Sequence, residues 1–176
     1  VKMNEALIVS TARTPIGKAY KGAFNNTHGA TLAGHAVKKA IETSGVDPSI
    51  VEDCLMGCAM PEGATGGNIA RQIAIRGGLP VTTAGATINR FCSSGMQAIT
   101  MAAQRIMSNE LDICVAGGLE SISLVQNEHQ NNFMAQEDWI NKHKPELYYT
   151  MIQTAEVVSQ RYNISRDAQD EYGLQS

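Results

Sequence analysis

Hydrophobic and polar residues along the chain predict strands and helices that follow one another in turn. Short apolar runs bounded by turn residues predict four strands, at 5–10, within 51–60, at 85–89 and at 111–116. Apolar residues recur every three or four positions over 31–44, 68–76 and 93–109, which is the spacing of amphipathic helices. Strands that alternate with helices are typical of crossover units. We therefore expect an α/β fold with a mostly parallel sheet flanked by helices on both faces.

Local signals mark the ends of these helices. Gly45 is predicted to end the first, Asn68 to be the N-cap of the second, and Gly77 to stop it. The apolar stripe of the third helix consists of Met96, Ile99, Ala103, Ile106 and Met107. We expect that stripe to face the core.

The alternation of apolar strands and amphipathic helices stops after residue 120. The stretch 126–144 is polar and predicts an excursion away from the sheet. Helical spacing returns over 151–162, and a further helix is expected with Ser165 as its N-cap. We therefore expect an α/β core over 1–120 and a separate region over 121–176.

Composition excludes some classes of function. The chain has 176 residues, of which 43% are hydrophobic, so it is long enough to bury a sizeable core. Its net charge is -3 and its basic residues are scattered, which gives nucleic-acid binding no electrostatic support. No apolar run approaches the length of a membrane span.

The four cysteines, Cys54, Cys58, Cys92 and Cys114, fit neither a zinc site nor a small disulfide scaffold. Cys54 and Cys58 lie in an apolar segment and are expected to be buried, inert thiols. Unpaired cysteines and the absence of a signal-peptide pattern at the start favour a reducing, cytoplasmic location. This pattern leaves open a targeting segment that was removed earlier.

Cys92 is the candidate nucleophile because of its position. A strand ends before it, the chain turns, and a helix begins at the cysteine. The free N–H groups of a first helical turn favour negative charge, so they stabilise a thiolate. Ser93, Ser94 and Gly95 are small and are expected to leave room for a bulky thioester. From the residues alone, a structural cysteine is an equal alternative.

The run NRFCSSGMQAI, at 89–99, resembles the acyl-enzyme motif of thiolases. Other thiolase-like stretches flank it in the expected order: ARTPIG at 12–17, GAF at 22–24, GNIARQ at 67–72, GLP at 78–80, AGGLES at 116–121, TAE at 154–156 and ISRDAQD at 164–170. The cysteine motif is specific, and the flanking motifs are strong in series. The resemblance covers nearly the whole chain.

The resemblance implies an acyltransferase with coenzyme A thioesters as substrates. Cys92 would take the acyl group from an acyl-CoA or 3-ketoacyl-CoA and pass it to CoA or to the carbanion of acetyl-CoA. The backbone N–H of Cys92 would contribute to the oxyanion site. No metal or organic prosthetic group is implied. Met151 matches a methionine of the acyl pocket, with an ordinary core methionine as the alternative.

The resemblance also implies an architecture. This chain would form an incomplete N-terminal half of a layered thiolase-type fold, with a fifth strand beyond Ser176. Residues 121–176 would begin the CoA-binding loop excursion. Homodimers or homotetramers are implied as well.

Some family features do not occur in this sequence. A thiolase also needs a histidine from a Gly-His-Pro motif and a second cysteine, and neither is found here. The four histidines, His28, His35, His129 and His143, are expected to be surface or packing residues. We therefore expect residues 1–176 alone to be inactive. Thr150 and Ile152 depart from the family pattern around Met151, which leaves the preferred acyl chain length open.

Other readings of the same residues give two alternatives to a thiolase. One is another condensing enzyme of the superfamily, such as a ketoacyl-carrier-protein synthase, and the other is a non-catalytic CoA- or lipid-binding module. Arg13 and Arg71 are expected to anchor loops. The glycine-rich loop at 63–67 lacks the spacing of a phosphate-binding loop and is expected to shape the backbone.

Overall fold

The computed structural model describes residues 4–176, which form two units. The first unit ends at Gln130 and the second spans Asn131–Ser176. Within residues 4–176, no helix has both the length and the apolar character needed to cross a membrane.

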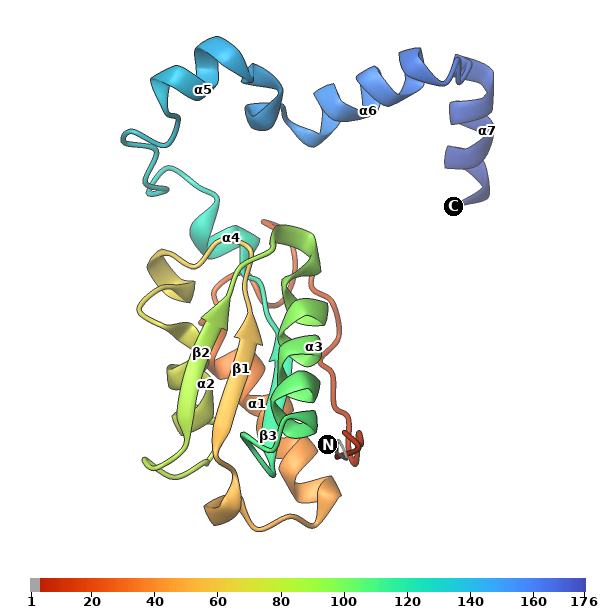
Figure 1. The fold of residues 1–176 in the computed structure, drawn as a ribbon. Helices are drawn as coiled ribbons and strands as arrows, with labels where there is room; N and C mark the ends of the chain where they lie inside the picture. The colour runs from red at the N-terminus through yellow and green to blue at the C-terminus, as the bar shows by residue number, and fades with distance from the viewer. Residues whose placement is uncertain (1–3) are drawn as a thin grey trace. The chain divides into compact units, whose positions relative to one another are not determined.

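The first unit is built on a parallel sheet of three strands. They are β1 (Asp53–Gly57), β2 (Ala84–Ile88) and β3 (Cys114–Gly118). β1 lies in the centre, and its Cys54 is in register with Gly85 of β2 and Val115 of β3. The expected parallel α/β sheet is thus confirmed (Figure 1).

Helices cover both faces of this sheet. The helices of the first unit are α1 (Gly29–Ser44), α2 (Ile69–Arg76), α3 (Ser94–Met107) and the short α4 (Ile122–Val125). α1 and α2 pack on one face of the sheet and α3 on the other. The chain moves one way from β1 to β2 and the opposite way from β2 to β3, so right-handed crossovers put α2 and α3 on opposite faces.

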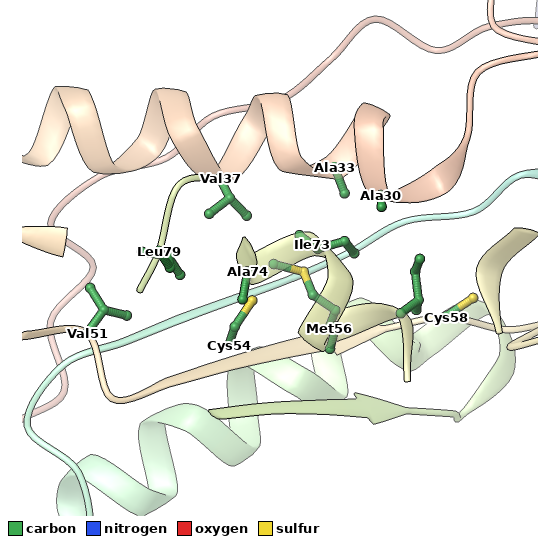
Figure 2. Close-up of a cluster of buried hydrophobic side chains, with 12 residues drawn as sticks. Ala30, Ala33, Val37, Val51, Cys54, Met56, Cys58, Ile73, Ala74 and Leu79 are labelled. Carbon is green, nitrogen blue, oxygen red and sulfur yellow. The ribbon is translucent and has the colours of Figure 1, made fainter. Parts of the chain in front are cut away.

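The side chains of β1 are divided between these two faces. Cys54, Met56 and Cys58 join α1 and α2 in one core cluster, which Figure 2 shows. Leu55 points the other way and packs against Ala98 and Ala102 of α3. A central strand buried on both faces accounts for the continuous apolar run of β1.

The strand predicted at 5–10 is wrong. This segment has no regular structure, and Leu7, Ile8 and Val9 are each at least 70% exposed. Apolar residues alone do not make a strand, because a strand also needs hydrogen bonds to a neighbouring strand. Within residues 4–176 the sheet consists of β2, β1 and β3, and the segment 5–10 pairs with none of them.

The predicted core face of α3 is wrong for Met96 and Ile99, which are exposed. Ala103, Ile106 and Met107 of the predicted stripe are half-buried. The residues fully buried against the sheet are Ser94, Ala98 and Ala102, whose small side chains let the helix approach the strands closely.

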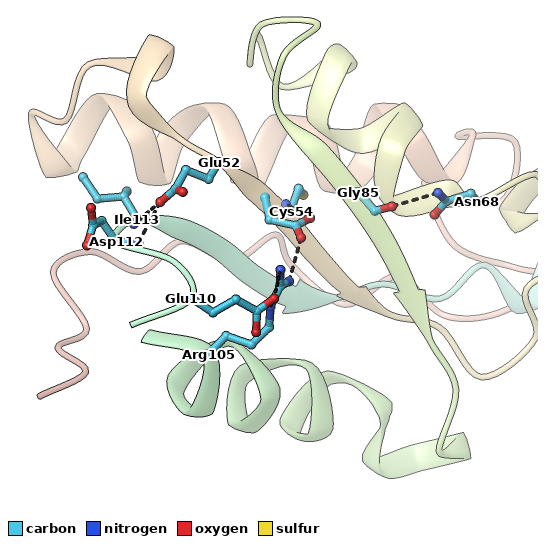
Figure 3. A network of polar contacts seen from close by, with 9 residues as sticks. Glu52, Cys54, Asn68, Gly85, Arg105, Glu110, Asp112 and Ile113 are labelled. Carbon is cyan, nitrogen blue, oxygen red and sulfur yellow. Dashed lines mark hydrogen bonds and ion pairs between the residues drawn. The ribbon is translucent and has the colours of Figure 1, made fainter. Parts of the chain in front are cut away.

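Two further boundaries differ from their predictions. β3 begins at Cys114 rather than at residue 111, and it includes Gly117 and Gly118. Asn68 precedes α2 as expected, but its side chain caps no helical N–H. Instead it donates to the carbonyl of Gly85 at 2.9 Å, which ties the start of α2 to β2 (Figure 3).

Polar contacts fasten the amino-terminal ends of β1 and β3. Arg105 of α3 contacts buried Asp53 at 2.7 Å and Glu110 at 2.7 Å (Figure 3). The carboxylate of Glu52 accepts from the backbone N–H groups of Asp112 at 2.7 Å and Ile113 at 3.2 Å. These contacts lie away from the carboxyl ends of the strands and hold the helix and the sheet in register.

The second unit is helical. Its helices are α5 (Asp138–His143), α6 (Met151–Arg161) and α7 (Arg166–Gln175), with a 3₁₀ turn over Pro145–Tyr148. Thr150 caps α6 in a reciprocal capping box with Gln153. Ser165 accepts from the backbone N–H of Ala168 at the start of α7, so the predicted N-cap is confirmed.

Candidate active site

Cys92 lies at the carboxyl edge of the sheet. β2 ends at Ile88, and a 3₁₀ turn over Phe91–Ser93 leads into α3 at Ser94. The thiol is in this turn and its residue is exposed. The predicted strand–turn–helix setting is confirmed, although the helix begins two residues after the cysteine rather than at it. Sites of α/β proteins gather at this edge, outside the carboxyl ends of the strands.

Hydrogen bonds hold the turn around Cys92. The Phe91 N–H donates to Oδ1 of Asn89 at 2.8 Å. Buried Ser94 donates from Oγ to the Phe91 carbonyl at 2.6 Å and accepts from the Arg90 N–H at 2.8 Å. Phe91 has a φ of +44°, a left-handed conformation that costs on the order of 1 kcal/mol for a side chain with a Cβ. The surrounding contacts thus fix a turn that the chain would not adopt by itself.

Two glycines set how closely the turn approaches the sheet. A Cβ on Gly57, the last residue of β1, would lie 2.2 Å from the carbonyl carbon of Ser94. A Cβ on Gly118, at the end of β3, would lie 3.1 Å from Cα of Gly95. The start of α3 therefore lies directly against the ends of β1 and β3, and buried Ser94 serves this packing rather than leaving room for substrate. Gly95 is half-buried, and a Cβ on it would make only ordinary contact with Gly118, at 3.7 Å. Of the three small residues only Ser93 is exposed.

The other three thiols have surroundings that disfavour a thiolate. Burial, reinforced by the charge of Asp53, raises the pKa of Cys54 to about 12. Burial first and the Glu120 carboxylate second raise the pKa of Cys58. Burial also raises the pKa of the Cys114 thiol, with Asp53 again adding to it. All three stay neutral thiols near pH 7, and Cys54 and Cys58 are buried as predicted.

We expect Cys92 to be the first cysteine alkylated in the folded protein. The thiolate is the species that reacts with iodoacetamide, and of the four cysteines only Cys92 is exposed to the reagent. Timed labelling at neutral pH with peptide mapping should show Cys92 reacting at least about tenfold faster than the others. In guanidinium chloride the four rates should converge. Faster labelling of Cys54 or Cys114 in folded protein would contradict this assignment.

Cys92 lines neither of two cavities found in the described residues, one in each unit. In the first unit, a cavity of about 530 Å³ lies between the segment 12–19 and residues 118–123. In the second unit, Met151 lines a hollow of about 420 Å³ together with Val158 and Ile164 of the same unit. Met151 is the first residue of α6 and is 72% exposed, so it is not a core methionine of its unit. Its role in an acyl pocket remains a prediction.

The histidines and the two arginines singled out in the sequence occupy structural or exposed positions. His28 accepts from the Ala30 N–H at the start of α1, and His143 stacks on Trp139. His35 and His129 are exposed, as expected. Arg71 donates to the carbonyls of Val81 and Thr83, which confirms its anchoring role, while Arg13 lines the first cavity. In the described part of the chain, no three His, Cys, Asp or Glu side chains gather as metal ligands would.

Sequence reasoning missed the residues that support the turn. Asn89 accepts from the N–H two residues later, an Asx turn that its position before a turn could have signalled. Glu120 accepts from the Ala59 N–H at 2.8 Å, and nothing in the sequence joins residues so far apart.

Comparisons with known proteins agree with this geometry. The family model described as "Thiolase, N-terminal domain" matches residues 6–176. A 3-ketoacyl-CoA thiolase of Bacillus subtilis (strain 168) is 40% identical over 99% of this chain, and one of Idiomarina loihiensis is 37% identical over the same share. The crystal structure of the Bacillus anthracis acetyl-CoA acetyltransferase superimposes on 99% of the chain with a TM-score of 0.81 and 34% identity. The chain spans 44% of each of these two thiolases and 46% of the crystallised chain.

Proposed function

The chain belongs to the thiolase family, and from this we propose that the complete protein is an acyltransferase whose acyl group is carried on Cys92. The single observation that supports this role most directly is the exposed thiol in a rigidly held turn at the carboxyl edge of the sheet. The proposal concerns the whole protein, because these 176 residues contain neither the Gly-His-Pro histidine nor the second cysteine that the family resemblance implies.

The proposed chemistry has two steps. In thiolysis, the Cys92 thiolate attacks the 3-keto carbon of a 3-ketoacyl-CoA, the C2–C3 bond breaks, acetyl-CoA leaves after its carbanion gains a proton, and the thiol of CoA then takes the acyl group from Cys92. In condensation, Cys92 attacks the thioester carbonyl of acetyl-CoA, the C–S bond breaks with CoA as the leaving group, and the carbanion of a second acetyl-CoA takes the acetyl group and frees Cys92. The backbone N–H of Cys92 contributes to stabilising the negative oxygen in both steps. Met151 is proposed to line the acyl pocket.

The proposed partners and setting follow from the family. The substrates are CoA and its thioesters, no prosthetic group is required, and the protein assembles as a homodimer or homotetramer. The names of the relatives, a 3-ketoacyl-CoA thiolase and an acetyl-CoA acetyltransferase, support the substrate class. Four free cysteines support a reducing, cytoplasmic setting.

Intact-protein mass spectrometry tests the proposal. The complete protein treated with acetyl-CoA should gain one acetyl group, which peptide mapping should place on Cys92. Acetyl-carrier-protein should serve poorly in a parallel reaction, and a preference for it would indicate the related synthases instead. Reversible CoA binding without any covalent adduct would indicate a non-catalytic binding module and overturn the proposal.

A further inference from the structure

The three strands of the sheet end in polar groups that contact one another. Asn89 follows β2 by one residue, Ala59 follows β1 by two, and Glu120 follows β3 by two. Because the strands are parallel, their carboxyl ends lie at one edge, which is the edge that carries Cys92. Neither Asn89 nor Glu120 belongs to the acyl-transfer chemistry described above.

The contacts form a continuous chain of hydrogen bonds. The carboxylate of Glu120 accepts from the Ala59 N–H at 2.8 Å. The carbonyl of Ala59 accepts from Nδ2 of Asn89 at 3.1 Å. Oδ1 of Asn89 then accepts from the Phe91 N–H at 2.8 Å, one residue before Cys92. The path thus uses both polar atoms of the Asn89 side chain, together with the backbone N–H and the backbone carbonyl of Ala59.

We propose that Glu120 and Asn89 are positioning residues for the turn that carries Cys92. The two side chains are connected through the backbone of Ala59. The effect of these residues on catalysis rests on the proposed function. Their effect on the conformation of the turn does not depend on it. Phe91 is held at a positive φ, so the turn needs outside contacts to persist. The Asn89 side chain accepts from the backbone N–H of Phe91. Glu120 holds the backbone of Ala59 in place, and the Ala59 carbonyl in turn accepts from Asn89.

The bond to a carboxylate is the anchor of this chain. A hydrogen bond to an ionised acceptor is roughly twice as strong as one between neutral groups. The second carboxylate oxygen of Glu120 lies 3.7 Å from the Cys58 thiol, whose raised pKa keeps it a neutral donor. Two groups therefore hold the Glu120 carboxylate, the backbone N–H of Ala59 and the buried thiol of Cys58.

Hydrogen–deuterium exchange of the complete protein tests the structural half. In Glu120→Ala, the peptide that contains Phe91 and Cys92 should exchange about tenfold faster, although Glu120 contacts neither residue. Glu120→Gln retains an oxygen that accepts from the Ala59 N–H, although more weakly because it is neutral, and should bring the exchange rate most of the way back to that of wild type. Asn127→Ala is the matched control, because Asn127 also accepts from an N–H two residues later and donates to a carbonyl, away from the strand ends. Unchanged exchange in Glu120→Ala would overturn the proposal.

Steady-state thiolysis tests the catalytic half. Per alkylatable Cys92, Glu120→Ala and Asn89→Ala should each lower kcat by about tenfold or more with KM within about threefold, because they misplace the nucleophile. Glu120→Gln should stay within about threefold of wild type, and Asn127→Ala should match it. If the two residues only stabilise the fold, both alanine variants should contain fewer reactive Cys92 thiols but keep the wild-type kcat per reactive thiol. That result would overturn the role in catalysis. If exchange in the Cys92 turn becomes faster in Glu120→Ala while wild-type protein forms no acyl-enzyme, the proposed function is wrong. The proposal that Glu120 and Asn89 hold the turn is then still supported.

Discussion

Replacing Cys92 by alanine is expected to abolish acyl transfer in the complete protein. Removing the nucleophile of another covalent enzyme lowers kcat by about 10⁶-fold, because no other group can take its part. The other thiols offer no substitute, since burial raises the pKa of Cys54, Cys58 and Cys114. We expect kcat for acetoacetyl-CoA thiolysis to fall by more than about 10⁴-fold. The measurement is steady-state thiolysis, together with the loss of the acetyl adduct in the mass spectrum.

The fold should survive this change, because the Cys92 side chain is exposed and belongs to neither core cluster. Circular dichroism and the unfolding midpoint should therefore stay close to those of wild type. Cys114→Ala is the matched control, since it also removes one thiol from the first unit but should retain turnover. Activity of Cys92→Ala near the wild-type level would show that another residue carries the acyl group.

Features decided by local chemistry could be predicted from the sequence. Gly45 ends α1 in the left-handed conformation that glycine adopts readily, and Ser165 caps α7 through its own hydroxyl. The strand–turn–helix setting of Cys92 could be predicted because the residues that form it are consecutive in the sequence. Each of these signals lies within a few residues of the feature it marks.

Features decided by partners far along the chain could not be predicted in the same way. The run at 5–10 is apolar enough for a strand, but whether it pairs depends on a neighbouring strand from elsewhere in the chain, and it pairs with none of β1, β2 and β3. The buried face of α3 is set by how near Gly57 and Gly118 let the helix come, so Ala98 and Ala102 are buried while Met96 is exposed. Glu120 meets Ala59 only because the strands before them are neighbours in the sheet.

Gly57→Ala is expected to lower kcat by about 10²-fold. The new Cβ would lie 2.2 Å from the carbonyl carbon of Ser94 and 2.3 Å from the nitrogen of Gly95. Both are backbone atoms of the helix start, so no side chain can rotate out of the way. The start of α3 must move away from β1 by roughly 1 Å, and a misplacement of that size can cost about 10²-fold in rate. Overpacking should also lower the free energy of unfolding by about 1–3 kcal/mol.

A series of three glycine variants makes this prediction sharp, because the same methyl group meets different surroundings. On Gly117 it would have only Met56 nearby, at 3.6 Å and in ordinary contact, so Gly117→Ala should keep kcat within about threefold of wild type. On Gly118 it would lie 3.1 Å from Cα of Gly95, a tighter contact with the same helix start, and the loss should be intermediate. The expected order of kcat is therefore Gly117→Ala, then Gly118→Ala, then Gly57→Ala. If Gly57→Ala turned over as fast as Gly117→Ala, the close approach of the helix start to the sheet would not be what holds Cys92 in place.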